Sequence, residues 1–259
     1  MTGIKIAVPA SGPLYEGHFP GLPILPGIGL IDLSIRALTT AGAAPTLREI
    51  TSLRLRKLVV PGDSLDLAMK SFEPDGAVRF EVRRGAEIVA NASVVLGACR
   101  SHQPDRAPIP CGPRRVVEAP PLDSLLPHRP PMRFIEGVEA ELDDGLVCAA
   151  SVPGRSAFAE DGSAPGIVAV EMAAQCAAVF EALRRTRKDE GAGPLIGYLV
   201  GARDVRFARG RVEADRSFLA TIRQSMNAPP LSTYGFAVED GVELVASGSL
   251  STWLTATPS

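Results

Sequence analysis

The sequence predicts an α+β fold in which each half of the chain wraps an antiparallel sheet around one buried helix. Two observations carry this prediction. An apolar segment with helical spacing follows a Pro-Gly turn at residues 26–38 and again at residues 165–183. Several short alternating segments, typical of strands, accompany each helix and end at Gly, Pro or Asp-Gly turns. Because the same elements recur in the same order, the pattern indicates a duplicated domain.

The composition is that of a globular chain with enough residues for one or two hydrophobic cores. Of its 259 residues, 46% are hydrophobic and 22% are charged, and the net charge is −2. This balance provides no field that would attract nucleic acid or a membrane surface. No apolar run reaches the ~20 residues that a membrane-spanning helix needs. The N-terminus lacks the features of a signal peptide, so we expect a cytoplasmic protein.

The first half begins with an alternating segment at residues 3–9, which predicts a strand. A loop rich in Pro and Gly follows; it contains His18 and leads into the first apolar helix. Apolar residues cover most of this helix, so we expect it to be buried on nearly every side. Asp32 lies one turn inside the helix, where a charge is costly unless it has a use. Further strands are expected at residues 49–60, 65–72, 77–83 and 87–96.

Residues 101–121 contain six prolines and little apolar periodicity, which predicts a linker. This divides the chain into an N-terminal domain, residues 1–100, and a C-terminal domain, residues 122–259. The second half opens with a short lead-in at residues 125–132, and its buried helix begins at Gly166 and ends near Arg185. Its strands are expected at residues 133–140, 145–152, 195–207, 217–224, 231–238 and 242–254.

The cysteines and histidines argue against a metal centre. The four cysteines show no CxxC spacing, and the chain contains three histidines in all. A disulfide framework, a structural zinc site and a multi-histidine metal centre are therefore not expected. Isolated cysteines of this kind usually act as small buried hydrophobic residues.

Four motifs resemble the β-hydroxyacyl-[acyl-carrier-protein] dehydratases of the FabA/FabZ type, which have the hotdog fold. They are GHFPGLPILPG at residues 17–27 with the acid at position 32, RKLVVPGDSL at 56–65, LLPHRPPM at 125–132 and VEMAAQ at 170–175. The two halves resemble, respectively, the two dehydratase-like partners of aryl polyene biosynthesis, here joined in one chain. The resemblance implies a double hotdog that converts 3-hydroxyacyl thioesters on acyl carrier protein into trans-2-enoyl thioesters. The substrate would bring its own phosphopantetheine arm, and no other cofactor or metal is implied.

One departure from the family motif decides where the site should lie. Aligning the two Pro-Gly turns places His18 opposite Ala157, so the second loop has no histidine. In the family, each site takes its histidine from one hotdog and its acid from the helix of the other. The resemblance therefore implies one composite site that joins His18 to Glu171. Asp32 is left as a candidate secondary acid in a pseudo-site that lacks a base.

The reaction needs a base for the C2 proton, an acid for the C3 hydroxyl and donors for the thioester oxygen. A histidine fits the first task, and a carboxyl group kept partly protonated by burial fits the second. Backbone N–H groups at a helix N-terminus fit the third. Gly166, which begins the helix that carries the acid, is the first candidate donor, and Gly27 is the second. The loop residues Phe19, Pro20 and Gly21 are expected to contact the substrate.

Two other functions remain open at this point, a hotdog acyl thioesterase and a non-catalytic subunit that binds acyl thioesters or acts as a scaffold. His128 is assigned an architectural role in the lead-in. Two cationic runs, residues 184–188 and 203–211, are either solvated faces or docking surfaces for an acidic carrier protein. The sequence does not indicate acyl chain length, double-bond isomerisation or further assembly of the internal pseudo-dimer.

Overall fold

The structure of the protein, a computed structural model, describes residues 3–98, 115–116, 118–188, 195–241 and 243–256. Most of the predicted linker lies outside the described residues. The helical elements are η1 (Pro13–Tyr15), α1 (Gly27–Thr40), α2 (Leu122–Leu125) and α3 (Val168–Lys188). The strands are β1 (Ile4–Ala7), β2 (Leu47–Leu55), β3 (Ser64–Phe72), β4 (Ala77–Arg84), β5 (Glu87–Leu96), β6 (Ile135–Leu142), β7 (Gly145–Ala150), β8 (Ser163–Pro165), β9 (Leu195–Phe207), β10 (Arg211–Glu213), β11 (Phe218–Ala228), β12 (Leu231–Glu239) and β13 (Leu244–Ala256).

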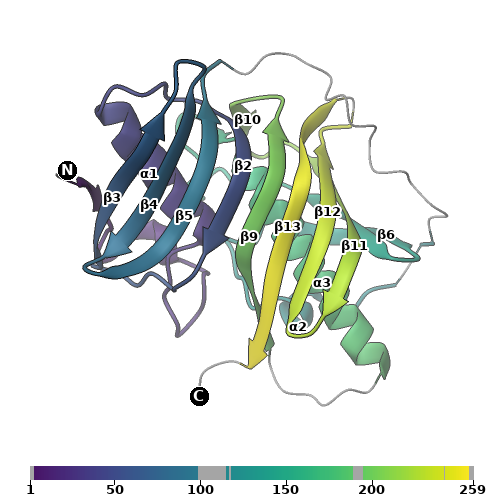
Figure 1. The fold of residues 1–259 in the computed structure, drawn as a ribbon. Coiled ribbons are helices and arrows are strands. Elements are labelled where there is room, and N and C mark those ends of the chain that lie inside the picture. The colour runs from purple at the N-terminus through teal and green to yellow at the C-terminus, as the bar shows by residue number, and fades with distance from the viewer. Residues whose placement is uncertain (1–2, 99–114, 117, 189–194, 242, 257–259) are drawn as a thin grey trace.

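Both halves contribute to one sheet of 11 strands, in the order β1-β3-β4-β5-β2-β9-β13-β12-β11-β7-β6. The halves join where β2 pairs antiparallel with β9, from Glu49 opposite Arg206 to Arg54 opposite Gly201. We call this junction the seam. Figure 1 shows the continuous sheet with α1 and α3 behind it, one helix for each half. The predicted α+β architecture is confirmed, and the two halves form a double hotdog with a shared sheet.

The helices are buried because their apolar side chains cover most of their surface. In α1, Ile28, Leu30 and Ile31 are almost completely inaccessible to solvent, and in α3 the same is true of Val170 and Met172. These side chains belong to one continuous core that runs through both halves. Burial of this apolar surface is the main force that holds each helix against its part of the sheet.

Several elements differ from the sequence prediction. The strand expected over residues 49–60 ends at Leu55, and the chain then turns so that Val59 accepts the N–H of Leu25 at 2.8 Å. The region expected as a loop before the second helix contains β8, which pairs with the unpredicted strand β10. The lead-in at residues 125–132 begins at the last residue of the short helix α2 and is otherwise irregular.

Two absences can be stated for the part of the chain that the structure describes. No helix there combines the length and apolar character needed to cross a bilayer. Cys148 and Cys176 are both free and buried, as predicted for isolated cysteines. The other two cysteines lie outside the described residues.

Candidate active site

The histidine loop holds His18 in one orientation. The backbone N–H of His18 donates to Tyr15 O at 3.1 Å, and its backbone O accepts the N–H of Ile24, also at 3.1 Å. The ring Nδ1 lies 3.0 Å from Ile24 O. Because a carbonyl oxygen can only accept, Nδ1 carries the proton and Nε2 carries the lone pair. The buried imidazole is therefore set in the tautomer that a base requires.

Glu171 enters the same region from α3 of the other half. Its Oε1 accepts a hydrogen bond from Gln175 Nε2 at 3.0 Å, one turn further along the helix. Gln175 is itself fixed, because its Nε2 also donates to Met132 O at 2.8 Å and its Oε1 accepts the N–H of Phe134 at 2.8 Å. The carboxylate thus has a defined rotamer although it is almost completely buried.

The second histidine of the site, His128, was not predicted as a functional residue. Its Nε2 lies 3.3 Å from Glu171 Oε1, and its ring meets the edge of Phe19 with 4.8 Å between centroids. The ring centroids of His18 and His128 are 5.3 Å apart. His128 Nδ1 is buried and has no partner among the described residues. The structure therefore places His128 in the site, whereas the sequence assigned it a mainly architectural role.

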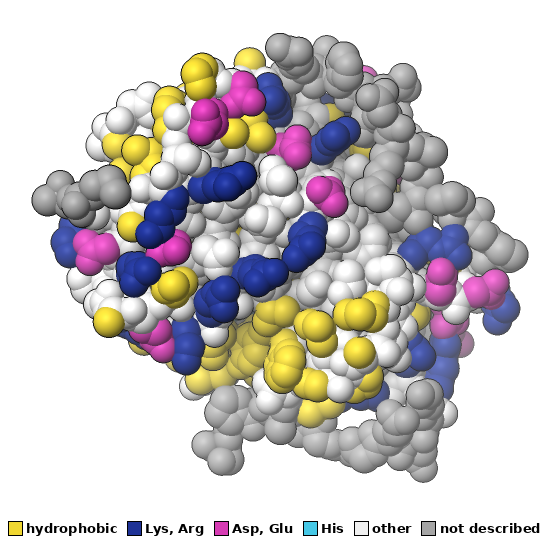
Figure 2. Space-filling model, viewed as in Figure 1, with side chains coloured by type: hydrophobic (Ala, Val, Ile, Leu, Met, Phe, Trp, Pro, Cys, Tyr) yellow, Lys and Arg dark blue, Asp and Glu magenta, His cyan; other side chains and the backbone are white. Residues whose placement is uncertain are grey.

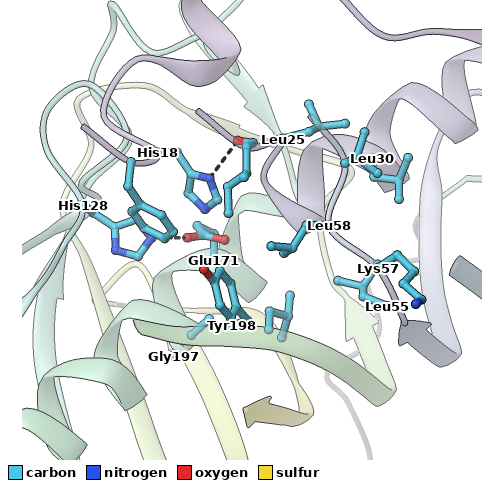
Figure 3. Close-up of a pocket in the computed structure, with 16 residues that line it drawn as sticks. His18, Leu25, Leu30, Leu55, Lys57, Leu58, His128, Glu171, Gly197 and Tyr198 are labelled. Atoms are coloured by element: carbon cyan, nitrogen blue, oxygen red, sulfur yellow. Dashed lines mark hydrogen bonds and ion pairs between the residues drawn. The ribbon is translucent and has the colours of Figure 1, made fainter. Parts of the chain in front are cut away.

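The three side chains border a cavity of about 60 Å³ that is otherwise mostly apolar. Figure 3 shows Glu171 with one carboxylate oxygen toward His128 and the other toward the cavity, below His18. Tyr198, on β9, also lines the cavity, and its buried hydroxyl has no partner among the described residues. Leu55 and Leu58 form part of the wall on the side away from His128.

Burial and neighbouring groups set the protonation states. Burial, with the nearby His128 as the next cause, lowers the pKa of His18 to about 4, so this imidazole is neutral at pH 7. For Glu171, burial is the largest single effect and raises the pKa. The hydrogen bond and charge of His128, the charge of His18 and the hydrogen bond from Gln175 together outweigh it, and the pKa falls below its usual value. The predicted partly protonated carboxyl group is therefore wrong; Glu171 rests as a carboxylate.

The two candidate donors for the thioester oxygen lie at different places. Gly27 lines the cavity that contains His18 and Glu171, and its N–H is in the first turn of α1, where a helix provides no acceptor. A Cβ at Gly27 would lie 2.5 Å from Leu55 Cδ1, so a side chain there would crowd the cavity wall. Gly166 donates its N–H to Gly210 O at 2.8 Å and lines another cavity. The prediction for Gly166 is wrong, because a neighbouring backbone segment already occupies its N–H.

Of the remaining predicted residues, some line the cavity that contains His18 and Glu171 and others do not. Phe19 lines the cavity and stacks on His18, with 4.2 Å between ring centroids. Pro20 and Gly21 form an exposed turn and are not part of the cavity lining, so their expected contact with substrate is not supported. Asp32 lies in the other cavity, about 440 Å³ in volume, where its Oδ2 is 2.8 Å from Arg36 Nε.

The cluster also has the composition of a metal site. His18, His128 and Glu171 each offer one ligand atom, and these atoms lie within 4.8 Å of one another. Ligands around a tetrahedral zinc ion are roughly 3.3 Å apart, given bonds of about 2.0 Å, so the cluster would have to contract to bind one. Counting histidines in the sequence did not reveal that two of them meet here. The expectation of a metal-free site remains a prediction.

Comparison with known proteins defines the class to which this fold and site belong. Residues 120–258, more than half of the chain, match the family described as ApeP-like, ApeP dehydratase, and residues 2–93 match ApeI-like, ApeI dehydratase. Among solved structures, the dehydratase domain of PpsC from Mycobacterium tuberculosis aligns with a TM-score of 0.64 at 17% identity, covering 97% of this chain and 92% of that domain. A monomeric dehydratase domain from a trans-AT polyketide synthase split module aligns with the same TM-score at 13% identity, covering 98% and 99%. The molecule is a double-hotdog dehydratase.

The sequence of this chain is also similar to those of FabZ dehydratases. The 3-hydroxyacyl-[acyl-carrier-protein] dehydratase FabZ of Desulforamulus reducens is 32% identical over 109 residues, which cover 37% of this chain and 75% of that protein. FabZ of Pelotomaculum thermopropionicum is 33% identical over 110 residues, with the same coverage. The chain belongs to the ApeP-like dehydratase family and resembles an ApeI-like and an ApeP-like dehydratase fused in one chain.

Proposed function

We propose that this dehydratase acts on 3-hydroxyacyl thioesters carried on acyl carrier protein and releases trans-2-enoyl thioesters from one composite site. The observation that carries the proposal is the meeting of His18, from the first half, with Glu171, from the second, across a single apolar cavity. The names of the FabZ relatives support a carrier-bound substrate. The motif resemblance and the ApeI-like and ApeP-like family matches support a place in aryl polyene or fatty-acid-like biosynthesis.

The first step is abstraction of the C2 proton by His18. Its Nε2 lone pair faces the site because Nδ1–H is bonded to Ile24 O, and its low pKa keeps the imidazole unprotonated at pH 7. Negative charge develops on the thioester oxygen as the proton leaves. The N–H of Gly27, reinforced by the positive end of the α1 dipole, is the donor that stabilises this charge.

The second step is departure of the C3 hydroxyl. The carboxylate of Glu171 accepts a hydrogen bond from this hydroxyl and orients it. Because Gln175 and His128 both bond Oε1, the other carboxylate oxygen, Oε2, is the one that accepts from the substrate. The imidazolium of His18 then returns the proton taken from C2 to the departing oxygen, and water is released. The proton count closes, because His18 ends neutral and Glu171 ends as a carboxylate. Glu171 also stabilises the transient imidazolium by its charge.

His128 acts in this mechanism as a positioning residue. It donates to the same oxygen of Glu171 as Gln175 does, so the carboxylate is held from two directions. The donor also keeps the buried carboxylate ionised, which burial alone would oppose.

The test is to incubate the protein with a 3-hydroxyacyl thioester and to follow enoyl absorbance and free thiol in the same sample. A dehydratase produces the enoyl signal without thiol. Thiol without the enoyl signal would instead identify a thioesterase. Substrate binding with neither product would identify a binding or scaffold subunit, and either of these results would overturn the proposal.

A further inference from the structure

The outer face of the sheet carries a group of arginines at the seam between the halves. Arg203 on β9 is opposite Ser52 on β2, and Ser52 is in turn opposite Ser93 on β5. Arg54 is opposite Gly201, one position further along the same face. Figure 2 shows Lys and Arg side chains running across this face, above an apolar patch. Ser52 and Ser249 are the cross-strand neighbours of Arg203, Gly201 and Asn91 are those of Arg54, and both arginines are exposed.

Ion pairing separates the arginines at the seam from several other cationic groups of the protein. Arg54 and Arg203 are exposed, and neither forms an ion pair within the described residues. By contrast, Arg187 is paired with Glu141, and Arg209 is paired with Asp240 and Glu243. The positive charge of Arg54 and Arg203 is therefore available to an external partner, whereas Arg187 and Arg209 already have acidic partners.

The groove lined by the exposed arginines shares one residue with the catalytic cavity. A groove of about 490 Å³ on the outer face is lined by Arg54, Arg56 and Arg203, together with Leu55. Leu55 also lines the cavity that contains His18 and Glu171, so this residue borders both the groove and the cavity. Next to it, Lys57 lines the cavity and Leu58 is 44% exposed. A chain entering the cavity here would arrive from the arginine-lined face.

We infer that the seam surface formed by Arg54, Arg56 and Arg203 docks an acidic acyl carrier protein, whose flexible arm enters the cavity past Leu55. This inference rests on the proposed function, because it assumes a carrier-bound substrate. A protein partner fits better than a small anion, since the cations are spread along a groove and do not converge on one point. Carboxylates along one face of the carrier would complement this row, and the exposed Leu58 would contact its apolar edge.

The experiment compares two substrates that share one reacting group. The double variant Arg54→Glu/Arg203→Glu is assayed with a 3-hydroxyacyl chain on acyl carrier protein and with the same chain on free pantetheine. We expect kcat/KM for the carrier-bound substrate to fall about 10-fold or more, and kcat/KM for the pantetheine substrate to change less than about 2-fold. In the wild type, kcat/KM for the carrier-bound substrate should fall steeply with added salt, and the variant should lose this dependence. Equal loss on both substrates, or no loss on the carrier, would overturn the inference.

A matched control separates docking from net charge. Arg155→Glu/Arg187→Glu changes the total charge by the same amount at two exposed positions that do not line the groove. We expect it to leave kcat/KM for both substrates within about 2-fold of the wild type; a loss equal to that of the seam variant would contradict a specific surface.

Binding of acylated carrier protein, measured by surface plasmon resonance, tests docking without turnover. A wild-type protein that binds the carrier through the seam but forms no enoyl product would refute the proposed function and retain the docking surface.

Discussion

Gly17 and Arg129 join the histidine loop of the first half to the lead-in loop of the second. The N–H of Arg129 donates to Gly17 O at 3.0 Å, and a Cβ on Gly17 would lie only 2.0 Å from Arg129 O. Gly17 directly precedes His18, and Arg129 directly follows His128. This contact therefore holds together the backbone segments that carry the two histidines.

Replacing Gly17 with alanine should disrupt that junction. Gly17 has a φ of +78°, and Gly21, in the same loop, has a φ of +77° but nothing near its Cβ position. Gly21→Ala is thus a control for backbone strain alone, which costs about 1 kcal/mol. We expect Gly17→Ala to lower the free energy of unfolding by more than Gly21→Ala and to reduce kcat strongly. Urea unfolding and initial rates measure both effects; equal behaviour of the two variants would show that the junction is unimportant.

The composite site predicts an asymmetric response to mutation of the two candidate acids, Glu171 and Asp32. His18→Ala should lower kcat about 10²- to 10⁴-fold, the range for loss of an acid–base group. Glu171→Gln should also lower kcat strongly, because it removes the charge that orients the hydroxyl and stabilises the imidazolium. Asp32→Asn should cost far less, because Asp32 lies in the other cavity and is paired with Arg36. Steady-state rates with a 3-hydroxyacyl thioester, with circular dichroism to verify folding, provide the measurement. An essential Asp32 with a dispensable Glu171 would show that the two halves pair differently.

The sequence was sufficient to predict the fold and the two residues that meet across the halves. The repeated Pro-Gly turn and helix placed Glu171 in register with Asp32, and the family resemblance implied that the one remaining histidine, His18, pairs with Glu171 of the other half. His128 could not be found in this way, because its loop has no periodicity and its contact with Glu171 depends on tertiary packing. A histidine between prolines, as in the first loop, was the available signal. Gly166 was misassigned because its partner, Gly210, belongs to a connection that the pattern did not reveal.

His128 can be tested by a pair of variants that differ in hydrogen bonding. His128→Gln can retain a donor toward Glu171, whereas His128→Ala leaves the carboxylate with Gln175 alone. Without His128, burial should raise the pKa of Glu171, and the pKa of His18 should rise as well. The acid limb of the kcat/KM profile should therefore move to higher pH in His128→Ala and move less in His128→Gln. A profile of reduced height at an unchanged pH would indicate a purely structural role.

The low pKa of His18 also predicts how stability depends on pH. An unfolded histidine titrates near 6.5, whereas His18 in the folded protein titrates near 4. Between these values the unfolded chain binds a proton that the folded protein does not, so stability falls as the pH drops from 6.5 toward 4. The full contribution of this one group is about 3 kcal/mol. Urea unfolding at pH 7 and pH 4.5 should show a larger loss for the wild type than for His18→Gln; identical losses would contradict the low pKa.

Tyr198 should show opposite effects on activity and stability. Its hydroxyl lines the catalytic cavity, is buried without a partner among the described residues, and has a pKa that burial raises. It is therefore protonated at pH 7 and free to donate a hydrogen bond to bound substrate. Tyr198→Phe removes this donor and keeps the ring, so we expect kcat/KM to fall about 10-fold, as for loss of one hydrogen bond made in the transition state.

The folded protein without substrate should not be weakened by the same change. A buried hydroxyl with no partner costs about 1–3 kcal/mol, so its removal should leave the free energy of unfolding unchanged or slightly higher. Initial rates and urea unfolding of the same preparations measure the two effects, and Tyr234→Phe is the contrasting control. The hydroxyl of Tyr234 donates to Glu181, and neither residue lines the cavity, so that variant should lose stability and keep activity. A Tyr198→Phe protein that loses stability and retains full activity would show that the hydroxyl serves the fold.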